Sequence, residues 1–265
     1  MKITPALAKT LLETTVDTAK AAGKLLFDNS RKTRQIQFKG RIDLVTEMDL
    51  RAEKLIVSRL RKALPESSFL TEEGSAQESA SDFKWIIDPL DGTTNYAHTF
   101  PVWSVSIALE YRGEVIVGCV YDPTRDELFT ATKHDKSRLN GRPISVTNRQ
   151  KLGQSLLATG FPYDIRTSPV NNLANFARFV KTARAVRRAG SAALDLCYLA
   201  CGRFDGYWEL KLHTWDMAAG VLIVKQAGGK ITDFSGNAFS IYTDKLLASN
   251  GRIHKEMQRV LARGK

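Results

Sequence analysis

Apolar side chains at the start of the chain repeat every three or four residues, which places them on one face of a helix. This repeat predicts a first helix over about residues 5–29. Its apolar positions are Leu7, Leu11, Leu12, Val16, Ala19, Leu25 and Leu26. A second repeat predicts a helix over about residues 47–64, stopped by Pro65. The apolar positions of this second helix are Leu50, Leu55, Ile56, Leu60 and Leu64.

Short apolar, β-branched runs follow the two helices and predict strands. The runs are "SFLT", "WII", "SVSIALEY", "EVIVGCVYD" and "ELFTATK", with turn sequences at "YRGE" and "YDPTRDE". Because the strands follow one another closely, we expect an antiparallel meander packed behind the two helices.

The polar stretch "NGRPISVTNRQ" is the best candidate boundary and predicts two halves, residues 1–145 and 146–265, within one catalytic unit. In the second half, predicted strands and helices alternate, which indicates a layered α/β arrangement. The predicted strands are "SLLATG", "DGYWEL", "KITDF" and "LLASN". The predicted helices are 170–182, "SAALDLCYLACG", "WDMAAGVLIVKQAGG" closed by Gly228, and 251–263.

Composition places the chain among ordinary globular proteins, with 265 residues of which 43% are hydrophobic. No segment approaches the roughly 20 uninterrupted apolar residues that span a membrane. The N-terminal segment has acidic residues within its apolar pattern, which indicates an amphipathic helix and not a signal peptide. Three cysteines, Cys119, Cys197 and Cys201, argue against a disulfide framework and for a reducing, cytoplasmic setting.

The formal net charge of +11 is spread along the chain, with modest clusters at "RKTRQIQFKGR" and "RAVRR". Such a charge is compatible with a small anionic substrate, and a solvated basic surface explains it equally well. Nucleic-acid association stays open, but no nucleic-acid-binding motif supports it.

The stretch "WIIDPLDGTTNYAH" carries the strongest chemical signal. A short apolar strand ends at Asp88, the following proline turns the backbone, and Asp91 can return its carboxylate toward the same point. The Leu90 carbonyl lies in the bend, and Gly92 permits backbone shapes that other residues resist. Two carboxylates and a carbonyl form an all-oxygen cage that suits Mg²⁺. A bare D-x-x-D, however, more often only caps a turn.

Further carboxylates stand at comparable junctions. Glu72 and Glu73 follow the strand "SFLT", Asp216 opens a helix in "HTWDMAAG", and Asp49 stands near the start of the second helix. Helix capping is the simpler explanation for Asp216 and Asp49 taken singly. Spacing alone does not bring these groups together in space.

Four motifs in order, "DLVTEMD", "FLTEEG", "WIIDPLDGTTNYAH" and "YWELKLHTWDMAAG", resemble those of the inositol monophosphatase family. The segment "RRAGSAALDLCYLACGRFDGYWE" is similar to the bacterial members. The resemblance implies a five-layer αβαβα sandwich, of the type shared with fructose-1,6-bisphosphatases. It also implies a Mg²⁺ cofactor, inhibition by Li⁺ and assembly as a homodimer.

The resemblance also implies a role for each matching residue. The implied metal ligands are Glu72, Asp88, the Leu90 carbonyl, Asp91 and Asp216. The implied water-activating group comprises Asp49, Glu72 and Thr93. The implied substrate contacts are Gly92, Thr93 and Thr94 for the phosphate, Gly190, Ala192 and Glu209 for the inositol ring and its hydroxyls, and also Asp216. Gly74 replaces a serine found in many members, and Lys39 receives no role because the spacing around "FKGRID" differs among members.

The leading hypothesis is Mg²⁺-dependent hydrolysis of myo-inositol monophosphate by a metal-activated water. The alternatives keep the chemistry and change the substrate to fructose-1,6-bisphosphate, a 3′-phosphoadenosine nucleotide or histidinol phosphate. A regulatory, nucleic-acid-associated role is the alternative of another class, and a non-catalytic member would be expected to lose ligands that are all present here. For His98 and His213, packing is favoured over catalysis, because neither has a Ser or Asp partner pattern.

Overall fold

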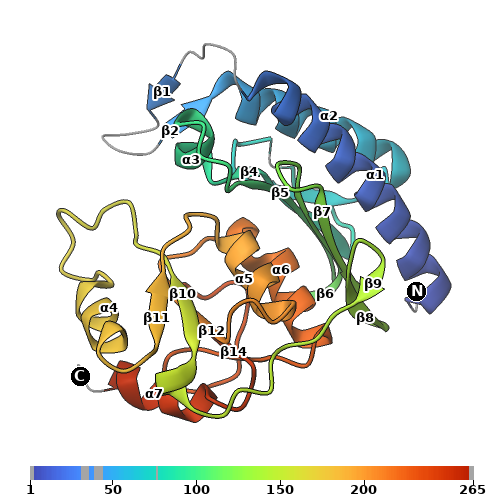
Figure 1. Cartoon of the computed structure of the whole chain (residues 1–265). Helices are drawn as coiled ribbons and strands as arrows, with labels where there is room; N and C mark the ends of the chain where they lie inside the picture. The colour runs from blue at the N-terminus through green and yellow to red at the C-terminus, as the bar shows by residue number, and fades with distance from the viewer. Residues whose placement is uncertain (1–2, 31–35, 39–43, 76, 263–265) are drawn as a thin grey trace.

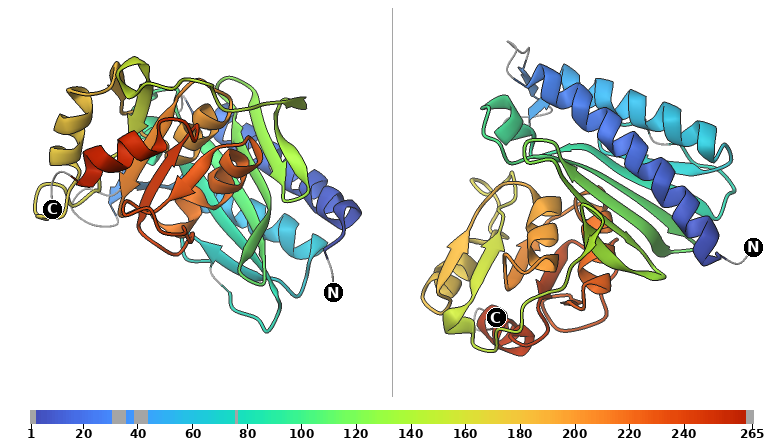
Figure 2. Two further views of the ribbon diagram at one scale, coloured as in Figure 1. Left: turned by 90° about the horizontal axis from the view of Figure 1, so that it is seen from below. Right: turned by 45° about the vertical axis from the view of Figure 1, so that its right-hand side comes forward.

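Helical layers and sheets alternate through the molecule (Figures 1 and 2). The computed structural model describes residues 3–30, 36–38, 44–75 and 77–262. Helices α1 and α2 cover the outer face of a seven-stranded sheet, and α5 and α6 fill the space between it and a five-stranded sheet. Helices α4 and α7 lie on the far side of the second sheet. This order confirms the αβαβα sandwich.

The first half contains two long helices and the seven-stranded sheet. Its helices are α1 (Pro5–Asn29), α2 (Glu47–Ala63) and the short α3 (Thr93–Ala97). The strands of the sheet, in spatial order, are β3 (Ser68–Thr71), β4 (Phe83–Asp91), β5 (Ser104–Tyr111), β6 (Glu114–Asp122), β7 (Glu127–Thr132), β8 (Asp135–Leu139) and β9 (Arg142–Pro143). A separate antiparallel pair joins β1 (Ile36–Phe38) to β2 (Leu44–Thr46).

The second half contains the five-stranded mixed sheet and four α-helices. Its strands, in spatial order, are β11 (Ala185–Arg187), β10 (Leu156–Thr159), β12 (Gly206–Leu210), β14 (Lys245–Ser249) and β13 (Lys230–Thr232). Its helices are the 3-10 turn η1 (Leu152–Gln154), α4 (Leu173–Val180), α5 (Ala192–Ala200), α6 (Thr214–Gln226) and α7 (His254–Ala262). The sequence pattern did not predict β1, β2, β8, β9 or β11, which are short or polar.

Helix α2 turns a different face to the core than its leucines suggest. Leu50, predicted to be buried, is 42% exposed, whereas Asp49 and Glu53 are 0% and 1% exposed. The buried positions 49, 52, 53, 56, 57 and 60 form one continuous helical stripe that excludes position 50. The helix therefore carries two carboxylates into the interior, one turn apart on the same face.

The first two strands of the large sheet run parallel, and this corrects the predicted antiparallel meander. Thr71 of β3 pairs with Ile87 of β4, while all other neighbours in this sheet are antiparallel. The reason is the connection of residues 72–82, which crosses back to the starting edge instead of turning tightly. The C-terminal ends of β3 and β4 consequently lie side by side.

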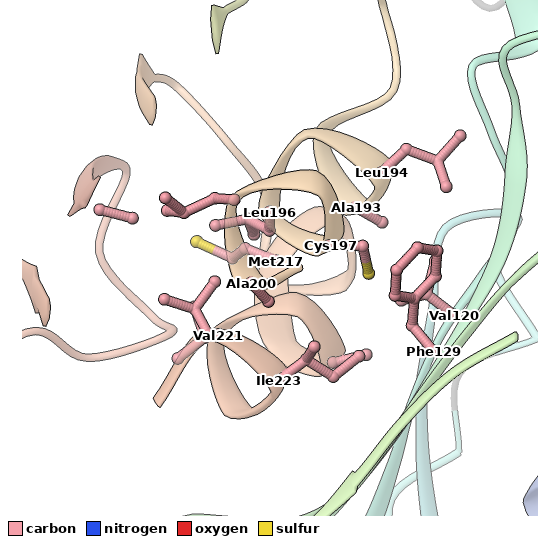
Figure 3. Close-up of a cluster of buried hydrophobic side chains, with 14 of the residues drawn as sticks. Val120, Phe129, Ala193, Leu194, Leu196, Cys197, Ala200, Met217, Val221 and Ile223 are labelled. Carbon is pink, nitrogen blue, oxygen red and sulfur yellow. The ribbon is translucent and has the colours of Figure 1, made fainter. Parts of the chain in front are cut away.

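The central helices α5 and α6 supply many residues of a hydrophobic cluster that also includes side chains of both sheets. Figure 3 shows Cys197 of α5 pointing toward Val120 and Phe129 of the large sheet. Gly118 of β6 allows α6 to approach closely, since a Cβ there would lie 2.9 Å from the Ala219 carbonyl oxygen. Cys197 is thus a small buried apolar residue, as predicted. Among the described helices, none combines the length and apolar character needed to cross a bilayer.

Candidate active site

A pocket of about 220 Å³ opens between the two halves of the molecule. Residues from β4, α3, α5, β12 and α6 converge on it. Ten of the predicted site residues line it: Glu72, Asp88, Leu90, Asp91, Gly92, Thr93, Gly190, Ala192, Glu209 and Asp216. The pocket therefore gathers motifs that are up to 144 positions apart in the chain, from Glu72 to Asp216.

The end of β4 is bent so that both of its aspartates reach the pocket. The pairing of β4 with β5 is irregular between Asp88 and Asp91, where Pro89 interrupts the ladder. The Leu90 backbone N–H donates to Asp88 Oδ1 at 3.0 Å and fixes the turn. Gly92 follows with φ of +100°, a left-handed conformation, and a Cβ there would lie 3.0 Å from the Val102 carbonyl oxygen.

Glu72 reaches the same place because β3 is parallel to β4. Its backbone N–H donates to the Ile87 carbonyl at 3.3 Å, one residue before Asp88, and after burial the Glu72 charge is the largest cause of the raised pKa of Asp88. The loop that carries Glu72 is held from α2. Glu53 accepts hydrogen bonds from the backbone N–H groups of Glu73 at 2.8 Å and Ser75 at 3.0 Å. Sequence reasoning missed this role of Glu53.

Asp91 connects the first half to the start of α5. Its carboxylate accepts hydrogen bonds from Ser191 Oγ at 2.5 Å and from the backbone N–H groups of Ala192 at 3.2 Å and Ala193 at 2.8 Å. The N-terminus of a helix favours negative charge, so this partner suits a carboxylate. The Ala192 N–H, expected to face the polyol, is bonded to Asp91 here.

Asp216 combines a capping role with a place in the pocket. It stands in the first turn of α6 and accepts a hydrogen bond from the His213 backbone N–H at 2.7 Å. His213 and Trp215 stack at 4.8 Å between ring centroids and both line the pocket. The packing role predicted for His213 is therefore incomplete, since its ring also forms part of the pocket wall.

Thr93 and Asp49 form a buried pair beside the carboxylates. Thr93 Oγ1 lies 3.0 Å from Asp49 Oδ1 and 3.0 Å from the Leu90 carbonyl oxygen. Thr93 lines the pocket, whereas Asp49 lies behind it and does not. Thr94, predicted to contact phosphate, is exposed on the first turn of α3 and does not line the pocket either.

The second sheet contributes Glu209 and Leu210 of β12 to the pocket lining. Glu209 of β12 accepts a hydrogen bond from Tyr207 Oη at 2.5 Å. Gly160 makes room for this side chain, because a Cβ there would lie 2.1 Å from Glu209 Oε1. Gly190 and Ala192 lie at the turn into α5. Lys39 lies outside the described residues.

Burial and mutual repulsion disfavour charge on these carboxyl groups. Burial raises the pKa of Asp88 well above its usual range, and the nearby Glu72, Asp91 and Asp216 raise it further. Burial also raises the pKa of Asp91 to about 6, against the opposing effect of its hydrogen bonds, and the pKa of Glu209 to about 7. The pKa of Asp216 is raised well above its usual range by burial.

The donor set has the chemistry of a site for a hard divalent cation. Four carboxylates and a carbonyl offer only oxygen, the ligand type preferred by Mg²⁺. In the part of the chain that the structure describes, no three His, Cys, Asp or Glu side chains are arranged to hold a metal ion directly. Asp88, Asp91 and Asp216 each bond to protein atoms instead. The residues thus fit the cation by type and by shared pocket, and a bound cation would offset the repulsion among them.

Several pocket residues were not anticipated from the sequence. They include the aromatic loop Phe161–Tyr163, Arg188, Ser191 and Asp195. Arg188 and Asp195 flank the predicted Gly190 and Ala192, so the segment "RRAGSAALDL" carried a usable signal. Ser191 caps α5, with its hydroxyl accepting from the Leu194 backbone N–H at 3.3 Å.

Comparison with known proteins agrees with this arrangement. Residues 7–263 match the model of the inositol monophosphatase family. The chain is 44% identical over 260 residues to the inositol-1-monophosphatase of Synechocystis sp., covering 97% of this chain and 91% of the relative. It is 41% identical over 256 residues to the Nus factor SuhB of Pseudomonas aeruginosa, covering 93% and 94%. The solved structure of inositol monophosphatase from Anabaena (Nostoc) sp. PCC 7120 is similar, with a TM-score of 0.88, 41% identity and 96% of each chain covered.

Proposed function

The chain belongs to the inositol monophosphatase family and is a phosphatase, and we propose that it hydrolyses inositol monophosphate with Mg²⁺ as cofactor. The observation that carries this proposal is one pocket lined by carboxylates from both halves of the molecule. Glu72 and Asp88 come from the first half and Glu209 and Asp216 from the second, and we assign Glu209 to the polyol hydroxyls.

The proposed cation site comprises Glu72, Asp88, Asp91, Asp216 and the Leu90 carbonyl. A divalent cation bound there would neutralise phosphoryl oxygens and lower the pKa of a bound water. The protein contributes by bringing these donors together in one pocket. It does so through the parallel β3–β4 edge, the bend at Pro89 and the helix starts of α5 and α6.

In the proposed reaction, Thr93 orients the attacking water. Its hydroxyl can donate to Asp49 and still accept a hydrogen bond from a water in the pocket. Asp49 fixes the side-chain rotamer of Thr93 from behind the pocket. It can accept a proton that the Thr93 hydroxyl relays from the water. Glu209 would accept hydrogen bonds from the alcohol, which fixes the ester relative to Thr93.

A panel of phosphate esters tests the proposed substrate and cofactor together. The purified protein, stripped of metal by EDTA, should be inactive and should recover activity with Mg²⁺. Inositol monophosphate should then have the highest kcat/KM among inositol monophosphate, fructose-1,6-bisphosphate, a 3′-phosphoadenosine nucleotide and histidinol phosphate. Full turnover in EDTA would contradict the cation requirement. A higher kcat/KM for another ester would make that ester the proposed substrate in place of inositol monophosphate.

The raised carboxyl pKa values predict that Mg²⁺ stabilises the protein more at neutral than at acidic pH. A carboxyl whose pKa rises on folding keeps its proton in the folded state, so its contribution to stability is lost as pH rises through the folded pKa. For Asp91 and Glu209 this loss of stability extends from about pH 4 to about pH 7. Mg²⁺ should therefore raise Tm by several degrees more near pH 7.5 than near pH 5, where protons already neutralise the site.

The measurement is a thermal melt with and without Mg²⁺ at both pH values. The pKa of the buried His254 is lowered to about 4, and its opposing pH dependence cancels because it is the same with and without Mg²⁺. An equal Mg²⁺ shift at the two pH values would contradict the prediction. Inhibition by Li⁺ and assembly as a homodimer stay predictions.

A further inference from the structure

Asp195 is a buried carboxyl group of the pocket that the proposed reaction leaves without a role. It stands in the first turn of α5, is 1% exposed and lines the pocket. Its Oδ1 atom has no hydrogen-bond partner among the described residues. A buried acceptor left unbonded costs about 1–3 kcal/mol, so this oxygen calls for a donor from outside the chain.

The surroundings of Asp195 select what kind of donor can bind there. Asp195 and Glu209 line the same pocket, and the pKa of Asp195 is raised first by burial and then by the charge of Glu209. The charge of Arg188 lowers the pKa of Asp195. The Arg188 guanidinium lies next to Gly190, where a Cβ would come within 2.8 Å of Nη1. Two carboxyl groups repel a second phosphate at this position. They favour an uncharged alcohol with neighbouring hydroxyl donors.

We propose that Asp195 is a specificity-determining residue that accepts a hydrogen bond from a hydroxyl of the substrate alcohol, beside the hydroxyls bound by Glu209. The inference rests on the proposed phosphatase function and narrows its substrate class to polyol phosphates. A site built to bond a hydroxyl discriminates strongly against esters that lack it, because the buried acceptor is then left unpaired.

The test compares two esters in two variants of the full-length enzyme. Asp195→Ala should lower kcat/KM for inositol monophosphate by about 10- to 100-fold, mainly through KM, and leave that for p-nitrophenyl phosphate nearly unchanged. Asp195→Asn keeps the side-chain volume and one acceptor oxygen, so its loss should be smaller. Free inositol should be a weaker competitive inhibitor of both variants. Its inhibition constant should rise in proportion to the loss of kcat/KM for inositol monophosphate.

A matched control separates recognition from damage to the fold. Asp122 is also fully buried, but it accepts hydrogen bonds from Thr124 and Arg125 and does not line the pocket. Asp122→Ala should keep the ratio of kcat/KM for the two esters even if its stability falls. Equal losses on both esters in Asp195→Ala, or no loss on either, would overturn the inference.

The wild-type protein separates failure of this inference from failure of the proposed substrate. If wild type prefers another hydroxylated ester, the inositol assignment fails, and the Asp195 variants are scored on that ester. If wild type prefers p-nitrophenyl phosphate to every hydroxylated ester, the polyol inference fails, although phosphatase activity is retained.

Discussion

Asp88→Asn should reduce phosphatase turnover by at least about 10²–10³-fold, the loss typical when one preorganised electrostatic group is removed from an active site. Asp88 is 2% exposed, lies near the end of β4 and accepts a hydrogen bond from the Leu90 backbone N–H. Asparagine preserves its volume and removes one negative charge from the proposed cation site. Calorimetric Mg²⁺ titration of the metal-free protein should show a matching loss of affinity.

The same substitution should leave the metal-free protein equally stable or more stable. Burial and the neighbouring Glu72, Asp91 and Asp216 all disfavour charge on Asp88, so an uncharged amide relieves repulsion. Active sites commonly carry such destabilising groups. Glu110→Gln is the matched control, since it alters a buried carboxylate on β5 that bonds to Tyr242 and lies outside the pocket. Retained turnover in Asp88→Asn would contradict its place in the cation site. Unfolding of this variant would show that Asp88 has a structural role instead.

Periodicity predicted the long helices and central strands well, because their side chains bury one face or both. The range 5–29 matches α1 to the residue, and the pattern of 47–64 matches α2 to within one residue. The buried face of α2 could not be predicted by hydrophobicity, since Asp49 and Glu53 occupy core positions and Leu50 does not. Those carboxylates are buried because Thr93 and the backbone after Glu72 supply hydrogen bonds, and both partners are remote in sequence.

The candidate site depended on a strand direction that periodicity does not encode. An antiparallel β3 would place Glu72 at the opposite end of β4 from Asp88, whereas the parallel pairing brings them into contact. The family resemblance supplied this proximity, and spacing alone did not. Asp195 was missed for a related reason: within an apolar helix it reads as one polar position, and only the packed structure shows its oxygen at the pocket.

Thr93→Ala should lower kcat by about 10²–10⁴-fold, the range for a positioned proton-transfer group, while Mg²⁺ affinity is largely retained. The hydroxyl lies 3.0 Å from Asp49 Oδ1, and Thr93 lines the pocket. Its loss removes one contact of the Leu90 carbonyl, whereas Asp88, Asp91 and Asp216 keep their own hydrogen bonds. Excess Mg²⁺ should therefore fail to rescue Thr93→Ala. It should partly rescue Asp91→Asn, in which a proposed ligand is weakened, although the new amide also faces the α5 donors that now bond to Asp91.

Asp49 provides the decisive comparison because it does not line the pocket but accepts a hydrogen bond from Thr93, which does. If the two residues work as one unit, Asp49→Asn should lower kcat, and combining it with Thr93→Ala should add little further loss. The measurement is kcat against Mg²⁺ concentration for both single variants and the double variant, with calorimetric Mg²⁺ binding alongside. Additive losses would mean that Asp49 and Thr93 act separately. Rescue of Thr93→Ala by Mg²⁺ would instead place its hydroxyl among the groups that bind the cation, because only a weakened binding step responds to cation concentration.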